Sequence, residues 1–309
     1  MTNPEEGPTL QLGPDGPQIW PMGIGTRFWG YGDEEADLNR RAAFDVALAA
    51  GVTLFDTAEI YAFGKSERLL GSFMQDHGSS AVIMTKYAPF PWRFGRKGIV
   101  TALRRSLERL GLKQVHLYMI HWPYTLTSIE TLVEGLADAV DAGLTKAVGV
   151  SNFNPSQMQR AHDFLAARGI PLATNQVAFS LLKRDPETNG LLDLCRQLNV
   201  TLVAYGPLAT GLLTGKYTPE HPSSGFLGLR NRKSDMIRLQ PLIRLMREIG
   251  EGHGGKTVGQ VALNWTIAKG ALPIPGAKNA RQAEDNIGAL GWSLTDEEVA
   301  GLDAAAQID

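Results

Sequence analysis

The sequence predicts an α/β fold: a single (β/α)8 TIM barrel over residues 1–309, with an N-terminal β-hairpin, a long loop after strand seven and a C-terminal tail helix. Short apolar strands alternate with amphipathic helices, which is typical of a parallel sheet covered by helices. No Gly-x-Gly-x-x-Gly follows the first strand, because Gly23-Ile24-Gly25 stops short of that motif. A doubly wound sheet is therefore disfavoured, and 309 residues fit one barrel of eight units.

The element boundaries follow from where the apolar runs stop. Residues 10–12 and 18–20 flank a Gly/Pro turn and predict a hairpin, over 10–20, that closes the bottom of the barrel. The barrel strands are expected at 22–26, 53–56, 82–86, 115–121, 145–150, 173–177, 201–205 and 271–275. Helices are expected at 37–50, 66–74, 97–110, 129–141, 155–168, 189–198, 239–249, 257–269 and 280–290, followed by a tail helix at 295–306.

Capping residues set several of these helix ends. Gly51 and Gly111 stand just past two helices, where glycine is favoured. Ser66 is expected to cap the helix that it starts, and proline follows a capping run at Pro155. Thr295-Asp296-Glu297-Glu298 reads as a capping box that opens the tail helix.

The segment 206–235 is rich in Gly and Pro and far longer than an ordinary loop. Long loops in compact domains usually close over a ligand. We therefore expect this loop to cover a bound cofactor.

Composition argues against several classes of partner. The 30 Lys and Arg balance 32 Asp and Glu, and no basic stripe follows the chain, so nucleic acid and acidic membranes are not expected partners. No apolar run approaches the ~18 residues needed to span a bilayer, and the first residues do not resemble a secretory signal. A single cysteine fits a reducing compartment, so we expect a cytoplasmic location. Six histidines without paired spacing argue against a metal site.

Three apolar runs end in a titratable residue. Leu54-Phe55 ends in Asp56, the run 81–85 ends in Lys86, and the run 115–120 ends in His121. The carboxyl ends of parallel barrel strands meet at one mouth, where barrel enzymes keep their chemistry. With Tyr61 in the loop after the second strand, these side chains are expected to form one cluster.

That cluster suits proton transfer to a carbonyl oxygen. A phenol has an ordinary pKa near ~10. An ammonium ~4 Å away, at an effective dielectric of ~20, stabilises the phenolate by roughly 4 kcal/mol, which lowers the pKa of the phenol by about 3 units. The negative charge of Asp56 partly cancels this effect. Lys86 is therefore expected to make Tyr61 a usable acid. Asp56 keeps Lys86 charged, and His121 orients the carbonyl oxygen or shares in the proton relay. Carbonyl reduction also needs a hydride from a cofactor.

The chain resembles the aldo-keto reductase family from Gly23 to the last barrel helix. The matching motifs are Gly23-Ile24-Gly25-Thr26, Phe55-Asp56-Thr57-Ala58-Glu59-Ile60-Tyr61, Thr85-Lys86, Ile120-His121-Trp122-Pro123, Gly149-Val150-Ser151-Asn152-Phe153, Asn175-Gln176, Gly211-Leu212-Leu213-Thr214-Gly215-Lys216-Tyr217 and Ile274-Pro275-Gly276-Ala277-Lys278. The resemblance implies NADPH-dependent reduction of aldehydes or ketones, with Tyr61 as proton donor of a tetrad with Asp56, Lys86 and His121.

The resemblance also implies a set of cofactor contacts. Ser151, Asn152 and Gln176 would hold the carboxamide of a nicotinamide stacked on Tyr205. Along the pyrophosphate, the implied contacts are Gly206, Leu208, Thr210, Leu212 and Lys216. At the adenosine end they are Lys278, Gln282, Asp285 and Asn286. Further implied cofactor contacts are Gly25, Thr26 and Gly276.

The sequence departs from the family pattern at one cofactor position. Some members place a cation where Gln282 stands, so a 2′-phosphate must be bound by Lys278, with help from Arg281 or a loop arginine such as Arg230. NADPH is still expected, because a phosphate at a helix N-terminus beside a lysine is stabilised by both dipole and charge.

Aromatic residues near the strand ends suggest the substrate. We expect Phe28, Trp29, Trp92 and Trp122 to line a pocket that favours apolar or aromatic carbonyls over sugar acids. The simpler alternative is a hydrophobic rim that only seals the barrel. Cys195 shares helical spacing with four leucines and is expected in the core.

Other functions remain open at this point. The tetrad alone also fits a regulatory subunit that binds NADP as a sensor, with little turnover. An aldolase that forms a Schiff base at Lys86 is a third hypothesis, disfavoured because a neighbouring aspartate keeps the amine protonated. Neither the physiological substrate nor the oligomeric state can be predicted.

Overall fold

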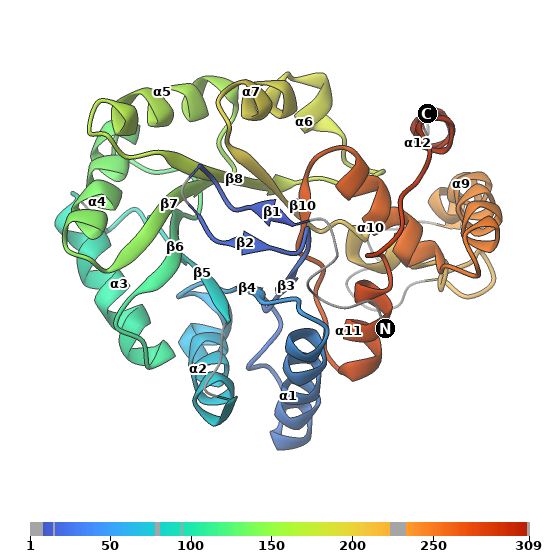
Figure 1. Cartoon of the computed structure of the whole chain (residues 1–309), viewed down its shortest axis with the longest axis horizontal. Coiled ribbons are helices and arrows are strands. Elements are labelled where there is room, and N and C mark those ends of the chain that lie inside the picture. The colour runs from blue at the N-terminus through green and yellow to red at the C-terminus, as the bar shows by residue number, and fades with distance from the viewer. Residues whose placement is uncertain (1–8, 15, 78–80, 94, 223–232, 308–309) are drawn as a thin grey trace.

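Eight parallel strands form a barrel in the computed structural model, which describes residues 9–14, 16–77, 81–93, 95–222 and 233–307. Each strand pairs with the next one along the chain, and helices surround them, so the predicted TIM barrel is confirmed (Figure 1). The strands are β3 (Gly23–Gly25), β4 (Leu54–Asp56), β5 (Val82–Tyr87), β6 (Val115–Ile120), β7 (Thr145–Ser151), β8 (Leu172–Ala178), β9 (Thr201–Tyr205) and β10 (Leu272–Pro273).

Helices alternate with these strands along the chain, and two more follow the last strand. They are α1 (Glu34–Ala49), α2 (Lys65–His77), α3 (Lys97–Leu110), α4 (Ile129–Asp141), α5 (Pro155–Ala166), α6 (Asp185–Thr188), α7 (Leu191–Gln197), α9 (Lys233–Gly252), α10 (Val258–Ala268), α11 (Ala280–Ile287) and α12 (Asp296–Ala305). Two short 3-10 helices, η1 (Tyr61–Gly64) and η2 (Ala209–Thr214), lie in the loops after β4 and β9.

A glycine contact closes the barrel between its first and last strands. Gly25 bridges to Gly276, and its N–H donates to the Pro275 carbonyl at 2.9 Å. A Cβ on Gly25 would lie 3.0 Å from the Ile274 carbonyl oxygen, so the strands meet where neither residue has a side chain. β10 is two residues long rather than the predicted 271–275, consistent with prolines that cannot donate to a ladder.

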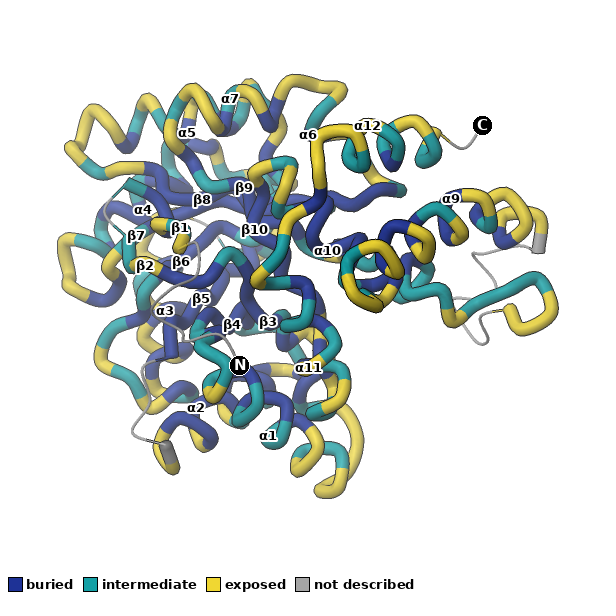
Figure 2. The backbone as a smooth tube through the Cα atoms, turned by 45° about the vertical axis from the view of Figure 1, so that its right-hand side comes forward, coloured by how far each residue is buried: buried dark blue, intermediate teal, exposed yellow. Residues whose placement is uncertain are grey.

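Alternate residues of the strands fill the barrel interior, which appears as the buried centre in Figure 2. Leu54, Met84 and Met119 belong to this interior cluster. Because side chains alternate between the two faces of a strand, the residue two positions on also points inward. The inward rows of β4 and β5 therefore end in Asp56 and Lys86.

The N-terminal hairpin covers the end of the barrel opposite these residues. β1 (Leu10–Gln11) pairs with β2 (Gln18–Ile19), and Leu12 and Ile19 pack into the interior cluster. The Gly13 N–H donates to the Thr201 hydroxyl at the start of β9. The predicted plug at the bottom of the barrel is observed.

Most of the expected helix caps are present. Gly51 and Gly111 adopt positive φ just past α1 and α3. Capping boxes join Asn154 to Gln157 in α5 and Thr295 to Glu298 in α12. Their side chains satisfy N–H groups that the helix leaves without partners.

Two predicted boundaries were wrong. Ser66 is not an N-cap, because α2 begins at Lys65 and the Ser66 hydroxyl is buried among other hydroxyl groups. Helix α9 begins at Lys233 rather than near 239, so the long loop is shorter than 206–235. Part of this loop, 223–232, lies outside the described residues.

Gly149 provides a test of packing between neighbouring strands. A Cβ there would lie 2.2 Å from the Thr174 hydroxyl oxygen and 3.0 Å from Met119 Cγ. We expect Gly149→Ala to destabilise the fold by about 1–3 kcal/mol through overpacking. Urea unfolding followed by circular dichroism measures the effect.

Gly301 is the matched control, because a Cβ there meets nothing within 4 Å and the residue lies inside α12. Gly301→Ala should be neutral or slightly stabilising. Equal urea midpoints for the Gly149 variant and the wild type would show that the strands move apart without cost.

Candidate active site

Four titratable side chains meet at the C-terminal mouth of the barrel. The Lys86 ammonium lies 2.7 and 2.8 Å from the two Asp56 carboxylate oxygens. It also donates to the Thr57 carbonyl at 2.8 Å and to the Tyr61 hydroxyl at 3.3 Å. His121 sets its ring edge-on to Tyr61, with centroids 5.8 Å apart. The structure thus brings together all four residues expected to cluster.

The ion pair at the centre of this cluster is removed from water. Lys86 is 0 % exposed and Asp56 is 3 % exposed. The Gln176 amide donates to Asp56 at 2.8 Å from β8. Burial of a charge is costly unless it is paired and hydrogen-bonded, and each carboxylate oxygen here has a donor.

A strained turn returns Tyr61 to the mouth. Ala62 and Phe63 follow it in η1 with φ of 47° and 53°, a region that costs residues with a side chain about 1–3 kcal/mol. Phe63 is 94 % exposed, so its ring gains little from this conformation. The turn lets the phenol fold back over Lys86, whose Nζ lies 4.9 Å from the ring centroid.

Buried hydroxyl groups hold the ends of β3 and β4 next to this pair. The Thr26 hydroxyl donates to the Asp56 carbonyl at 2.9 Å. It also lies within hydrogen-bond distance of the Ser66 hydroxyl, at 2.8 Å. Ser66 lies 3.0 Å from the Thr57 hydroxyl. Thr26 was expected to contact cofactor, but its hydroxyl is engaged inside the protein.

Sequence reasoning missed two acids that position the site. The fully buried Glu67 carboxylate accepts from the Thr85 hydroxyl and from Arg109, each at 2.6 Å, and so fixes the residue before Lys86. Glu59 accepts from the Ala88 N–H at 2.7 Å and pairs with an arginine of the next loop. For Glu67, the available signal was an acid inside an otherwise apolar helix face.

Burial and neighbouring charge act in opposite directions on the pKa values of Lys86 and Tyr61. Burial alone would lower the pKa of Lys86, but Asp56, with Tyr61, outweighs it, and the net pKa is raised. Burial raises the pKa of Tyr61, and Lys86 opposes this without reversing it. The expectation of a net downward shift at Tyr61 was therefore wrong for the unliganded chain, because loss of hydration exceeds the attraction of the ammonium.

His121 is neutral at physiological pH. Burial, followed by the cations of Lys86 and Arg27, lowers its pKa to about 2. Its Nδ1 is buried without a hydrogen-bond partner among the described residues. A neutral imidazole can orient a bound oxygen, whereas it has no extra proton to give.

The same electrostatics bear on the aldolase hypothesis. A Schiff base requires a neutral amine as nucleophile. Lys86 is fully buried, charged and bound by Asp56, so it is a poor candidate.

Residues expected to bind a nicotinamide ring lie beside the tetrad. The Ser151 hydroxyl donates to the Gln176 carbonyl, and the Asn152 amide donates to Ser151 and to the His121 carbonyl. The Tyr205 hydroxyl donates to Asn152 at 3.0 Å and fixes its ring next to these polar groups. A flat ring bordered by amide and hydroxyl groups fits an aromatic carboxamide.

The loop after β9 has the backbone of an anion-binding site. Between Gly206 and Gly215, positive φ occurs at Gly206, Ala209, Thr210, Gly211 and Gly215. Turns of this kind present N–H groups to an anion. Lys216 adds an ammonium, which lies 4.7 Å from the Tyr217 ring centroid, so the loop fits a pyrophosphate.

The predicted adenosine-end residues surround the start of α11. Lys278 is exposed, and its N–H donates to the Gln282 side chain at 2.8 Å. Asp285 accepts from the Thr257 hydroxyl, and Asn286 donates to the Gly276 carbonyl. Gln282 therefore braces the loop, and Lys278 and the exposed Arg281 are cations at this helix N-terminus, whereas Arg230 lies outside the described residues.

The pocket prediction was partly wrong. Trp29 is 0 % exposed and packs in the core against Phe55 and Phe73, with its Nε1 donating to the Ala277 carbonyl. It lines no pocket. Its neighbour Phe28 is exposed instead.

An aromatic row leads from the rim to the tetrad. Trp92 is 71 % exposed and stacks on Phe90 at 4.8 Å. Phe90 meets Trp122 edge-on at 5.8 Å, and Trp122 lies 4.7 Å from the His121 ring. This row provides an apolar wall beside the mouth.

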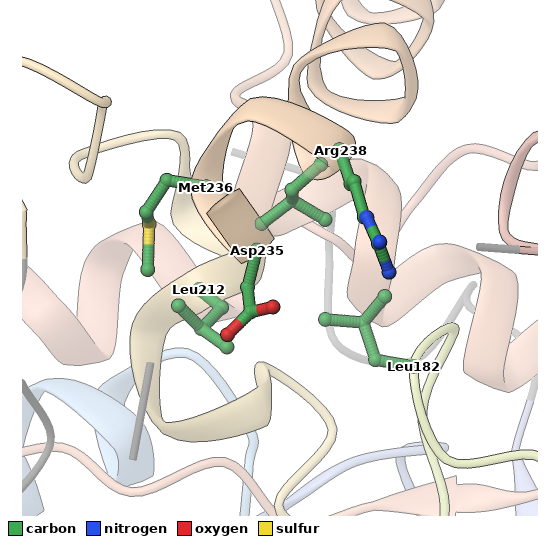
Figure 3. A pocket seen from close by; sticks show the side chains of 6 residues that line it. Leu182, Leu212, Asp235, Met236 and Arg238 are labelled. Carbon is green, nitrogen blue, oxygen red and sulfur yellow. The ribbon is translucent and has the colours of Figure 1, made fainter. Parts of the chain in front are cut away.

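Leu212 and Cys195 both lie away from the tetrad, and Cys195 lies in the core as expected. Figure 3 shows a surface pocket of about 210 Å³ between Leu182, η2 and the start of α9, away from the tetrad; Leu212, an expected cofactor contact, forms part of its wall. Cys195 is buried in the core, where burial raises its thiol pKa to about 12.

The described residues include neither a metal site of clustered ligands nor a helix that could span a membrane. No group of three His, Cys, Asp or Glu side chains there is placed to hold a metal ion. None of the described helices is both long and apolar enough to cross a membrane.

Lys86→Met tests the buried ion pair. It leaves the Asp56 carboxylate buried without its cation, so we expect a loss of about 3–5 kcal/mol in the free energy of unfolding. In Asp56→Asn/Lys86→Met no charge remains, and the loss should be smaller. Urea titrations of both variants measure the difference. A double variant as unstable as the single one would show that packing, rather than the charge, sets the cost.

Comparison with known proteins agrees with this geometry. The Aldo/keto reductase family model matches residues 21–307. Pyridoxal reductase, chloroplastic, of Arabidopsis thaliana is 40 % identical over 94 % of this chain and 84 % of its own length. Two solved structures are also similar. The glycerol dehydrogenase AKR11B4 of Gluconobacter oxydans has a TM-score of 0.86 and 28 % identity, covering 96 % of this chain and 94 % of its own. A Klebsiella pneumoniae aldo-keto reductase in complex with NADPH has a TM-score of 0.76 and 27 % identity, with the same coverage. This chain belongs to the aldo/keto reductase family.

Proposed function

We propose that this protein reduces small aldehydes and ketones with NADPH and that Tyr61 is the proton donor. The observation that carries the proposal is the 3.3 Å contact between the Lys86 ammonium and the Tyr61 hydroxyl, beside the buried Asp56. When bound, a reduced nicotinamide supplies the hydride for carbonyl reduction. The protein must then bind the carbonyl, supply a proton and exclude water.

Hydrogen-bond accounting gives the direction of the Tyr61 proton. The Lys86 ammonium is only a donor, and its three hydrogens meet Asp56, the Thr57 carbonyl and Tyr61. The phenol oxygen is therefore an acceptor toward Lys86. Its own hydrogen points away from the ammonium, so it is free to bond a carbonyl oxygen in the mouth.

The protonation states suit this transfer. Burial raises the pKa of Tyr61, so the phenol holds its proton at neutral pH until a stronger base forms. The alkoxide produced by hydride addition is such a base. After transfer, Lys86 stabilises the phenolate by roughly 4 kcal/mol for charges ~4 Å apart at an effective dielectric of ~20.

His121 complements Tyr61 without competing for its role. A pKa of about 2 keeps the imidazole neutral, so it hydrogen-bonds the carbonyl oxygen and does not protonate it. Asn152 anchors its backbone carbonyl, and the Tyr87 carbonyl accepts from its N–H. The ring is thereby fixed beside the phenol.

The cofactor would lie across the mouth from the nicotinamide site to α11. Ser151, Asn152, Gln176 and Tyr205 would hold the nicotinamide, and the 206–216 loop the pyrophosphate. We propose NADPH over NADH because Lys278 stands at the N-terminus of α11, where charge and helix dipole both favour a phosphate. The NADPH complex of the Klebsiella pneumoniae structure supports this choice.

The substrate proposal rests on the aromatic wall. Phe28, Trp92 and Trp122 surround the mouth with apolar surface, which favours aromatic or apolar carbonyls. The Arabidopsis thaliana relative is named for pyridoxal, an aromatic aldehyde. The one cysteine, buried and free, fits our expectation of a reducing, cytoplasmic environment.

Tyr61→Phe tests the proton donor. We expect kcat for 4-nitrobenzaldehyde to fall by about 10²–10⁴-fold, the usual contribution of a general acid, while the Kd for NADPH stays unchanged. NADPH absorbance measures turnover, and fluorescence titration measures binding.

Tyr31→Phe is the control, because it removes one hydroxyl from an exposed tyrosine of the loop after β3. Unchanged turnover in Tyr61→Phe would disprove the assigned acid. Tight NADPH binding by the wild type with no turnover across an aldehyde panel would favour a sensor subunit instead.

The pH dependence of carbonyl reduction tests the roles of Tyr61 and His121. Reduction needs Tyr61 in its protonated form, which is present below the pKa of Tyr61 and is lost as the pH rises past that value. Burial raises the pKa of Tyr61 above the ordinary value of ~10. His121, with a pKa of about 2, contributes no change near neutrality. We expect kcat/KM for the aldehyde at saturating NADPH to be flat from about pH 5.5 to 9 and to fall only at higher pH. A break near pH 6.5 would show that His121 titrates in the working enzyme.

A further inference from the structure

Arg27 is a cation at the mouth that the proposed reaction does not use. It follows Thr26, whose hydroxyl is bound to the Asp56 carbonyl, so its loop is tied to the end of β4. Arg27 is exposed, and its guanidinium lies 5.8 Å from the Phe28 ring centroid. Within the described residues it forms no ion pair.

Two anchors fix the loop that carries Arg27 across the barrel seam. On one side, the Thr26 N–H also donates to the Asp56 carbonyl, at 2.9 Å. On the other, the Trp29 indole donates to the Ala277 carbonyl at 2.8 Å. Arg27 therefore stands between two anchored residues and directly follows the one that is bonded to Asp56.

The positive charge of Arg27 affects the pKa values of three residues at the mouth. It opposes the burial-induced rise in the pKa of Tyr61 and of Tyr205, and it contributes to the low pKa of His121. These three residues come from η1, from the end of β6 and from the end of β9. Together with the bonds that tie Thr26 to the Asp56 carbonyl, this puts Arg27 at the rim of the reacting end of the site.

Among the residues that the structure describes, no carboxylate pairs with Arg27 in this part of the mouth. The carboxylate of Asp56 is committed to Lys86, and His121 is neutral. A planar guanidinium binds a carboxylate through two parallel hydrogen bonds, and such charge-assisted bonds strengthen where water is displaced.

We propose that Arg27 binds a carboxylate carried by the carbonyl substrate, so that the preferred substrates join an anionic group to an aromatic or apolar body. This proposal rests on the proposed reductase function and names its substrate class. It differs from the expectation drawn from aromatic residues alone, which favoured uncharged carbonyls.

The cofactor is the competing ligand for Arg27. The Lys278 ammonium, at the N-terminus of α11, lies 5.0 Å from the centroid of the same Phe28 ring. Lys216 lies in the loop that fits a pyrophosphate. Cations are thus already present where phosphates are expected, whereas Arg27 is an exposed cation whose charge reaches Tyr61 and His121.

The test compares two aldehydes of the same skeleton, 4-carboxybenzaldehyde and its neutral methyl ester, methyl 4-formylbenzoate. With NADPH saturating, the wild type should show the higher kcat/KM for the acid. Arg27→Gln should lower kcat/KM for the acid by about 10- to 100-fold, mainly through KM, and change the ester less than about threefold. Arg27→Lys should retain part of the preference.

Arg105→Gln is the matched control, since it removes an equal charge from the exposed face of α3. It should leave both substrates unchanged. The Kd for NADPH, from fluorescence titration, should be the same in wild type and Arg27→Gln.

Three outcomes would overturn the proposal. The first is an equal kcat/KM for the two aldehydes in the wild type, and the second is an equal loss of kcat/KM for both aldehydes in Arg27→Gln. The third is weaker NADPH binding by Arg27→Gln, which would assign Arg27 to the cofactor. In each, the ester is still reduced and the proposed function stands. If the wild type reduces neither aldehyde, the proposed function fails as well.

Discussion

The buried ion pair between Asp56 and Lys86 constrains the whole mouth of the barrel. Neither charge could be buried alone without a cost of several kcal/mol, and the pair is tolerated only because further donors and acceptors complete it. Gln176 reaches Asp56 from β8, while the Thr57 carbonyl and Tyr61 accept from Lys86. The ion pair thus fixes three strand ends and one loop relative to one another, and the proton donor is positioned by the group that would stabilise its anion.

The seven residues from Tyr61 to Glu67 link this pair to the surrounding helices. A left-handed turn presents the phenol, and the next two buried polar residues, Ser66 and Glu67, bind the ends of β3, β4 and β5 through hydroxyl groups. Strain in the turn is offset by hydrogen bonds a few residues later. A single stretch of chain therefore carries both the acid and the contacts that orient its partners.

Much of this site could be predicted, because the period of two along a strand is visible in the sequence. An apolar run ending in Asp56 or Lys86 reveals an inward row that turns polar at the mouth. Loops have no such period, so nothing in the sequence distinguished the buried Trp29 from the exposed Phe28. The net pKa shift of Tyr61 was also beyond reach, since it depends on how much water burial removes.

The seam between β3 and β10 separates the two charged ends of the proposed site. The barrel closes there through backbone alone, at Gly25 and Gly276, so the loops on either side can approach closely. The Phe28 ring contacts cations of both loops, with Arg27 at 5.8 Å and Lys278 at 5.0 Å from its centroid. The face of an aromatic ring attracts cations. In the proposed complex, Arg27 would bind an anion on the substrate and Lys278 an anion on the cofactor, so the two anions would bind at once without sharing a partner.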